Sequence, residues 1–336
     1  MKSKHLFAIA FLSLFIVATA QDSPKPQQSS YTLSGPYIHE NLTVFLVHGK
    51  DLTDKTFLTL QEALEAKKAR VYETKDVNKL AIENFSNQDV YVQAGDIVRG
   101  GEQDRMISVD FIVPPKSGRM PIAAFCVESG RWNKRGNEEA GTFSSSENAV
   151  ALKELKLAAK REASQQAVWT NVKVAQEKLG RNVGGSVADS ASASSYELSV
   201  ENSKVKQTTA EYTEVLQGIV RGKSDVIGYV FAINGHVNSA DVYASRALFI
   251  KLWPKLLKAS AVEAIAELNK DVEVKPIASE AIEEFLVEAE KPSAAAKEVT
   301  KRVKVVTRED KNNIFFETQD SAQKDGWVHR NYIKKQ

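Results

Sequence analysis

The residues best suited to recognition chemistry lie in one polar stretch, Arg99-Gly-Gly-Glu-Gln-Asp-Arg105. The guanidinium groups at its two ends can each bind a phosphate or a carboxylate through two hydrogen bonds. The paired glycines let the backbone approach a ligand closely or adopt positive φ. The alternative is a tight β-turn whose charged side chains are solvated. The ligand-binding candidates in this stretch are Arg99, Glu102, Gln103 and Arg105.

A second polar stretch, Cys126-Val-Glu-Ser-Gly-Arg-Trp132, follows a predicted strand. If residues 124–128 are extended, Cys126 and Glu128 lie on the same face of that strand. A cysteine nucleophile needs a base such as histidine, and no histidine has a spacing to Cys126 that indicates a dyad. A packed thiol is therefore favoured, because free cysteine is among the most buried residue types. The ligand-binding candidates here are Glu128, Arg131 and Trp132.

The predicted strand pairing brings these two stretches together. Residues 106–113 and 121–127 are predicted strands joined by the Pro-rich turn 114–118, so they should pair antiparallel. Antiparallel pairing places Arg105, before the first strand, beside Glu128, after the second. Two arginine-bearing segments next to Trp132 suit an anionic ligand with a planar group. The structural alternative is that Arg105 and Glu128 form an ion pair.

The sequence lacks the motifs of several well-defined sites. The glycines at 100–101 are not followed by Gly-Lys-Ser/Thr, as a phosphate-binding loop requires. The histidines are scattered and the single cysteine has no second cysteine to pair with, so no zinc site is indicated. The acidic residues near Asp104 do not match a calcium loop, and no Gly-x-Ser-x-Gly motif is present. We predict no metal and no cofactor, and the motifs leave open whether the protein is an enzyme.

The N-terminus has the pattern of a signal peptide. Lys2 and Lys4 precede an apolar run over 6–17, and Ala18 and Ala20 occupy the −3 and −1 positions of a cleavage site. The apolar run is too short to span a bilayer, which takes roughly 20 residues. We predict that residues 1–20 are removed and that the protein is exported to the periplasm or the extracellular space.

Composition limits the partners of the processed chain. Removing 20 of the 336 residues leaves 316 and takes the formal charge from +2 to 0. The processed chain therefore has no strong basic field for nucleic acid or an anionic membrane. It has no other apolar run long enough for a transmembrane helix, so we expect a soluble protein. Cys126 is the only cysteine, which rules out an intramolecular disulfide.

The first part of the processed chain is predicted to be β-rich. Residues 21–36, with several Pro, Gln and Ser, are expected to form a flexible spacer. Thr59 and Glu62 make a capping box for a short helix over 59–67. The strands predicted before the central helices are 42–47, 71–73, 79–84, 90–93, 106–113 and 121–127.

The middle of the chain is predicted to be helical, with an inserted hairpin. Ser144 and Glu147 suggest a capping box for a helix ending near Gly180, and Thr208 with Glu211 suggests another. Asn234-Gly235 favours a type I′ turn in a hairpin over 226–243. The remaining predictions are a mobile loop over 181–195, an apolar helix after 243, a helix over 279–290, a linker over 291–297, and terminal strands at 303–306, 314–317 and 327–332.

The order of these elements indicates the fold class. Strands come first, helices follow and strands return, whereas a doubly wound fold alternates the two. We therefore predict an α+β fold, with residues 37–336 forming a single globular domain.

Several of these segments together resemble one bacterial domain family, which is associated with ADP-ribosylglycohydrolases and rhodanese-phosphatases and has no known function. The resemblance implies a link to ADP-ribose-like ligands. Family members often carry a lysine and an asparagine where this chain has Gly101-Glu-Gln-Asp-Arg105, which weakens the case for an anion site there. The segments that carry the resemblance are Asn41-Leu-Thr-Val-Phe45, Leu58-Thr-Leu-Gln-Glu-Ala-Leu64, Gly101-Glu-Gln-Asp-Arg105, Pro114-Pro115, Cys126-Val-Glu-Ser-Gly-Arg-Trp132, Asn234-Gly-His-Val-Asn-Ser-Ala-Asp-Val-Tyr243 and Leu252-Trp-Pro-Lys-Leu-Leu257.

Three functions are compatible with the sequence. The favoured hypothesis is an exported domain that binds an anionic small molecule or a partner without catalysis; an ADP-ribose-like molecule is the example that the resemblance implies. Arginine, glutamine and tryptophan supply recognition chemistry, and no activated nucleophile is evident. The second is a hydrolase of a phosphorylated or ribosylated small molecule, and the third is a structural component of the cell envelope. The ligand and the oligomeric state are left open.

Overall fold

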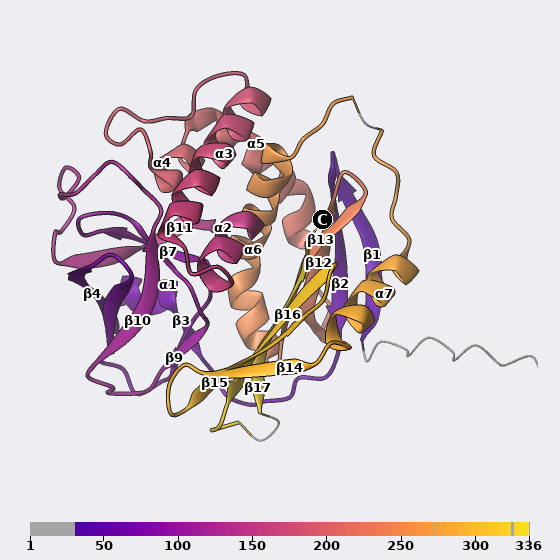
Figure 1. The fold of residues 1–336 in the computed structure, drawn as a ribbon. Helices are drawn as coiled ribbons and strands as arrows, with labels where there is room; N and C mark the ends of the chain where they lie inside the picture. The colour runs from indigo at the N-terminus through magenta and orange to yellow at the C-terminus, as the bar shows by residue number, and fades with distance from the viewer. Residues whose placement is uncertain (1–30, 272, 324–325, 336) are drawn as a thin grey trace, which may run out of the picture.

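The computed structural model describes residues 31–271, 273–323 and 326–335, and it confirms the α+β class (Figure 1). The helices are α1 (Leu60–Glu65), α2 (Lys153–Lys160), α3 (Gln165–Val183), α4 (Tyr196–Val200), α5 (Ser203–Leu216), α6 (Arg246–Ala266) and α7 (Ser279–Glu290). The strands are β1 (Thr32–His39), β2 (Leu42–His48), β3 (Leu58–Thr59), β4 (Ala69–Asp76), β5 (Lys79–Asn84), β6 (Val90–Val92), β7 (Asp96–Gly100), β8 (Arg105–Ile107), β9 (Phe111–Val113), β10 (Arg119–Cys126), β11 (Thr142–Val150), β12 (Val226–Ile233), β13 (His236–Tyr243), β14 (Ala294–Glu298), β15 (Val303–Glu309), β16 (Asn313–Asp320) and β17 (Trp327–Lys334).

The larger sheet joins the two ends of the described chain. Its strand order is β1-β2-β12-β13-β17-β16-β15-β14, and all its pairs are antiparallel. The predicted hairpin of β12 and β13 is confirmed, and Asn234 and Gly235 have φ of 52° and 78°, as a type I′ turn requires. Helix α6 packs on one face of this sheet and α7 on the other (Figure 1).

The first part of the chain forms a closed barrel with the order β10-β5-β4-β11-β7-β8, next to a small sheet of β3, β6 and β9. The long strand predicted over 106–113 is wrong as one element. Its first half, β8, pairs with β10 as expected, whereas β9 leaves the barrel and pairs with β6. The break falls at Asp110, whose carboxylate accepts from Ala94 N and His329. These bonds draw the chain away from β10.

The helical layer begins later than the capping patterns predicted. Ser144 lies in β11, which pairs with β4 and β7 in the barrel, so the capping box at 144–147 is wrong. The helices of this layer are α2 and α3, and α3 ends at Gly184 in the left-handed conformation rather than at Gly180. Helix α5 is capped by Asn202, and Thr208 lies inside it. The capping box of Thr59 and Glu62 is confirmed.

Two segments expected to be irregular contain strands. The spacer predicted over 21–36 is wrong from Thr32 onward, because β1 pairs with the edge of β2. The linker predicted over 291–297 contains most of β14, an exposed edge strand paired with β15. The first pairs with β2 and the second with β15, so each is extended beside a neighbouring strand. Residues 1–20, predicted as a signal peptide, lie outside the described residues.

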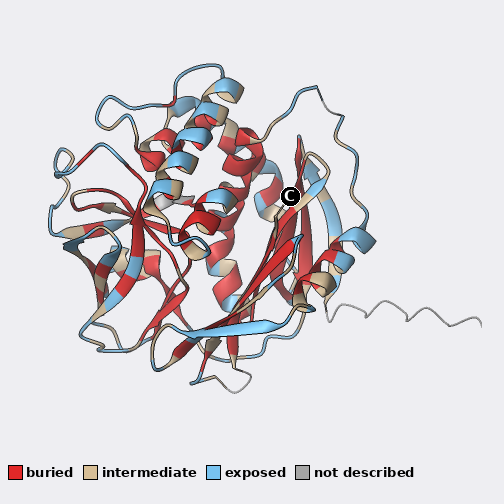
Figure 2. Cartoon of the chain, viewed as in Figure 1, coloured by how far each residue is buried: buried red, intermediate tan, exposed pale blue. Residues whose placement is uncertain are grey.

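One apolar core is shared by the sheet, the helices and the barrel. It includes Leu46 of the sheet, Trp253 of α6 and Phe125 of the barrel. The buried residues are concentrated along β12 and α6 (Figure 2). No helix in the described part of the chain is long and apolar enough to cross a membrane. The organisation of 37–336 as one domain stays a prediction.

Candidate functional site

The two polar stretches singled out in the sequence do lie side by side. Cys126 of β10 is opposite Arg105 of β8, so the loop before β8 contacts the segment after β10. Gln103 Nε2 donates to the backbone carbonyl of Glu128 at 2.8 Å, and the backbone N–H of Asp104 donates to Glu128 Oε2 at 3.1 Å. The predicted antiparallel pairing therefore correctly placed the two polar stretches beside each other.

Glu128 and Arg131 form the buried centre of this cluster. Arg131 donates to Glu128 through Nε and through Nη2, each at 2.9 Å. Arg131 also donates to the carbonyls of Gly101 and Asn133. Burial disfavours the ionised form of Glu128, but Arg131, Ser192 and the backbone N–H of Asp104 together outweigh it and lower the pKa of this carboxyl group. Arg131 is thus held by internal partners.

Arg105 is also buried and internally bonded. Its Nη1 donates to Gln103 Oε1 and to Cys126 Sγ, and its Nη2 lies 3.4 Å from Glu73 Oε2. Burial raises the pKa of Cys126 to about 11. A thiolate is the nucleophilic form of cysteine, so Cys126 is a packed thiol at neutral pH.

The remaining sequence candidates lie at the rim of the cluster. Arg99 is partly exposed and pairs with Glu201 at 2.6 Å. The Trp132 side chain is 53% exposed, and Glu102 is partly exposed. The structure therefore separates a buried group of Gln103, Arg105, Glu128 and Arg131 from a rim of Arg99, Glu102 and Trp132. A ligand role for these seven residues stays a prediction.

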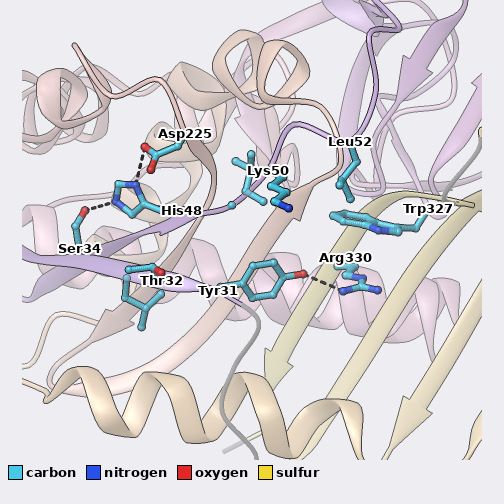
Figure 3. A pocket seen from close by; sticks show the side chains of 12 residues that line it. Tyr31, Thr32, Ser34, His48, Lys50, Leu52, Asp225, Trp327 and Arg330 are labelled. Carbon is cyan, nitrogen blue, oxygen red and sulfur yellow. Dashed lines mark hydrogen bonds and ion pairs between the residues drawn. The ribbon is translucent and has the colours of Figure 1, made fainter.

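A pocket of ≈ 600 Å³ opens at one end of the larger sheet (Figure 3). Its walls come from β1, from β2 and the loop after it, from the start of β12, and from β17. Apolar surface is supplied by Leu52, Ile227 and Trp327. This volume lies within the roughly 300–1,000 Å³ typical of small-molecule sites.

Two cations line this pocket, and their surroundings differ. Arg330 donates to Glu317 at 2.8 Å and to Tyr31 Oη at 2.9 Å, and its guanidinium lies 4.5 Å from the centre of a Trp327 ring. Lys50 is exposed and has no hydrogen bond or ion pair with any residue that the structure describes. The ammonium group of Lys50 is therefore available to an anion that enters the pocket.

A chain of hydrogen bonds crosses the wall of the same pocket. Asp225 Oδ1 lies 2.9 Å from His48 Nδ1, and His48 Nε2 lies 2.7 Å from Ser34 Oγ (Figure 3). The hydrogen bond to His48 is the main cause that lowers the pKa of the Asp225 carboxyl group. His48 is thus bonded at both ring nitrogens, to an acid on one side and a hydroxyl on the other.

Comparison with protein families gives one match over nearly the whole described chain. The ARG and Rhodanese-Phosphatase-superfamily-associated Protein domain, ARPP-1, matches residues 30–333. The chain belongs to this family. No curated protein and no solved structure matches it. The resemblance noted in the sequence is thereby confirmed, and with it the association with ADP-ribosylglycohydrolases and rhodanese-phosphatases.

The structure of this ARPP-1 domain adds residues to the barrel cluster that sequence reasoning missed. Arg135 forms two hydrogen bonds with the Asp104 carboxylate, at 3.0 and 3.2 Å. Glu197 of α4 is buried beside Ser146, which donates to it at 2.7 Å, and burial raises the pKa of Glu197 to about 7. Arg135 lies only four residues after Arg131, and this closeness in sequence was a weak indication that Arg135 belongs to the same cluster. Nothing in the sequence marks Glu197, which reaches the barrel from a distant helix.

The pocket residues of the ARPP-1 domain were also missed. Ser34, His48 and Asp225 are far apart in sequence and match no short motif, so only the strand pairing of the sheet brings them together. Among residues 31–271, 273–323 and 326–335, no group of three or more His, Cys, Asp or Glu side chains is placed to hold a metal ion.

Proposed function

We propose that this ARPP-1 domain is an exported protein that binds an anionic small molecule with a planar group in the pocket at the end of the larger sheet. The observation that carries the proposal is the exposed ammonium of Lys50 beside the apolar wall of Leu52 and Trp327. A cation without a partner among the described residues can pair with a phosphate or carboxylate, and an aromatic wall supports a planar ring.

The pocket meets the requirements of the predicted ligand better than the barrel cluster does. In the barrel, the guanidinium groups of Arg105 and Arg131 already bond to internal carboxylates. An anion would have to displace Glu73 or Glu128, both of which are on the protein itself. At the pocket, an anion can pair with Lys50 without displacing a carboxylate of the described residues. The family's association with ADP-ribosylglycohydrolases supports an ADP-ribose-like molecule, which combines a planar base with phosphates.

The first prediction concerns the binding of ADP-ribose. Titration calorimetry of the wild-type protein is expected to detect binding, and Lys50→Ala is expected to weaken it by roughly 10- to 150-fold. This range corresponds to the loss of about 1.5–3 kcal/mol for a hydrogen bond to a charged group. Lys270→Ala removes another exposed lysine, away from the pocket, and should leave the affinity unchanged.

The same titration separates the pocket from the barrel. Arg99→Ala at the rim of the barrel cluster is expected to leave ADP-ribose affinity unchanged. If Arg99→Ala weakens binding and Lys50→Ala does not, the ligand site lies at the barrel, as the sequence alone predicted. If neither wild type nor variants bind ADP-ribose, this ligand class is wrong.

The second prediction concerns export. Mass spectrometry of the mature protein is expected to find Gln21, or its cyclised form, at the N-terminus, because Ala18 and Ala20 fit a signal peptidase site. Ala20→Arg should block cleavage, and Ser29→Ala, beyond the cleavage site, should not. An intact Met1 on cell-associated wild-type protein would overturn the proposed localisation.

A further inference from the structure

The hydrogen bonds among Ser34, His48 and Asp225 have a specific direction. Asp225 is an acceptor when ionised, so it accepts the proton on His48 Nδ1 at 2.9 Å. When the ring is neutral, that tautomer leaves a lone pair on His48 Nε2, which faces Ser34 Oγ at 2.7 Å. A histidine held in this way can take the proton of the serine hydroxyl, as in nucleophilic serine catalysis.

The sheet places these three side chains by register. Thr32 is opposite His48 and Ser34 is opposite Leu46, so Ser34 and His48 are diagonal neighbours on one face of β1 and β2. The register shifts directly after Ser34, between Ser34 and Tyr37. A bulge of this kind re-aims a side chain and is over-represented next to active sites.

The third side chain is positioned by the close approach of the next strand. The backbone N–H of Gly49 donates to the Asp225 carbonyl at 2.9 Å. A Cβ atom at position 49 would lie 2.5 Å from the end of the Ile227 side chain, so the two segments approach closely here. The backbone hydrogen bond from Gly49 thus holds Asp225 next to the residue that follows His48.

A purely structural role explains this arrangement less well. The Asp225 side chain is 61% exposed, and an exposed ion pair contributes at most about 1 kcal/mol. Such a pair has no need of a hydroxyl on the opposite ring nitrogen. Ser34 and His48 also line the pocket that contains Lys50, so the hydroxyl lies where the proposed ligand would bind.

We propose that Ser34, His48 and Asp225 form a nucleophilic triad that hydrolyses a carboxylic ester of an anionic small molecule. This inference rests on the proposed function, since the pocket must first hold the anion. Ser34 Oγ forms a bond to the ester carbonyl carbon as its proton passes to His48 Nε2. The C–O bond to the alcohol then breaks, and the alcohol leaves with that proton. Water hydrolyses the acyl-serine by the same route, releasing the acid and restoring Ser34.

The experiment is active-site labelling of the full-length mature protein with an alkyl fluorophosphonate. Ser34 Oγ forms a bond to phosphorus, the P–F bond breaks, fluoride leaves and the proton goes to His48. Tandem mass spectrometry is expected to find the adduct on Ser34. His48→Ala is expected to slow labelling by roughly 10²–10⁴-fold, the usual contribution of a general base. Ser144→Ala, which removes an exposed serine of the barrel, should label at the wild-type rate.

The outcomes distinguish failure of the triad from failure of the proposed function. Absence of an adduct on Ser34, or equal labelling rates for wild type and His48→Ala, overturns the triad. Thermal unfolding checks that His48→Ala is folded, and Asp225→Asn, expected to slow labelling as well, replaces it if it is not. The unlabelled wild-type protein should bind ADP-ribose if the proposed function is correct, whether or not Ser34 reacts. Labelling of Ser34 in a protein that does not bind ADP-ribose would keep the triad and overturn only the ligand class.

Turnover provides the second measurement. The wild-type protein is expected to release 4-hydroxybenzoate from 4-acetoxybenzoate, an ester with a planar ring and a negative charge. Ser34→Ala should lower the rate to that of the uncatalysed reaction. If Ser34→Ala hydrolyses the ester as fast as the wild type, Ser34 is not the nucleophile.

Discussion

Replacing Arg131 with methionine is expected to lower the free energy of unfolding by about 3–5 kcal/mol. Arg131 is buried, and its guanidinium lies between two buried carboxylates, 2.9 Å from Glu128 and 3.4 Å from Asp104. Methionine fills much of the volume but leaves Glu128 without its main partner. Removing one member of a buried ion pair costs about this much because the other charge stays buried and uncompensated. Urea denaturation monitored by circular dichroism measures the change.

The matched control is Arg99→Met. Arg99 also pairs with a carboxylate, Glu201 at 2.6 Å, but at the partly exposed rim of the same cluster. Exposed pairs contribute about 0–1 kcal/mol, so this variant should unfold near the wild-type denaturant concentration. If both variants lose the same small amount, the Arg131 pair contributes no more than a surface ion pair.

The burial of Arg105 and Arg131 decides which residues of the barrel cluster can test ligand binding. If Arg105 and Arg131 only bound a ligand, replacing either would affect binding with little effect on stability. Their burial makes them part of what holds the loop before β8 to the segment after β10. A loss of binding in either variant would then reflect altered folding as much as lost contact. The rim residues Arg99 and Trp132 are the informative positions for a ligand at the barrel.

Local sequence signals predicted the parts of the fold that depend on neighbouring residues. The capping box at Thr59, the turn at Asn234-Gly235 and helix α7 were all correct, because each is determined within about one turn of chain. Strands β1 and β11 were not predicted. The sequence of β11 is rich in Ser, and β1 contains Gly35 and Pro36, residue types that are depleted in strands. Both are extended because they pair with the neighbouring strands β7 and β2.

For the candidate sites too, features set by neighbouring residues were predicted and features set by distant contacts were not. Adjacency of the two barrel stretches followed from one hairpin, so it could be predicted. Burial of Arg131 and Glu128 could not, because charged residues are mostly exposed unless they find partners, and the partner Arg135 lies outside both stretches. The pocket depends on pairing between β1, β2 and β12 across much of the chain, and no local pattern reports such pairing.

The largest expected pH effect comes from a second buried cluster, centred on His329. Its ring nitrogens lie 2.9 Å from Asp110 Oδ2 and 2.9 Å from Asp241 Oδ1. Both partners are carboxylates, so both nitrogens donate and the ring is the imidazolium. Its other neighbours are the rings of Tyr91 and Tyr243, and the cations Lys156 and Lys160 act on the two carboxylates.

The direction of each pKa shift sets the pH window of this stabilisation. Burial disfavours the charged form of His329, but the two carboxylates outweigh it and raise its pKa. Burial likewise opposes ionisation of Asp110 and Asp241, yet His329 together with Lys160 for Asp110 and Lys156 for Asp241 lowers both pKa values. The histidine contribution is complete below the unfolded pKa of about 6.5 and is lost as pH rises through the folded value. The aspartate contribution is complete above about 3.9 and is lost as pH falls through the folded values.

The free energy of unfolding contributed by this cluster is therefore expected to be greatest between about pH 4 and pH 6.5. Above pH 6.5 it should fall by up to about 1.4 kcal/mol per pH unit, because the folded protein holds one more proton than the unfolded chain. Urea unfolding at a series of pH values measures this slope. His236→Gln, which changes an exposed histidine, should keep it.

Two variants of the cluster test the assignment to His329. His329→Gln should lose the alkaline decline while lowering stability at every pH, because Asp110 and Asp241 stay buried without a cation. Asp241→Asn leaves the imidazolium one carboxylate and lowers its folded pKa, so the decline should still begin near pH 6.5 but end at a lower pH. This variant provides the measurement if His329→Gln does not fold. An unchanged alkaline decline in either folded variant would show that His329 does not carry the charge in the native protein.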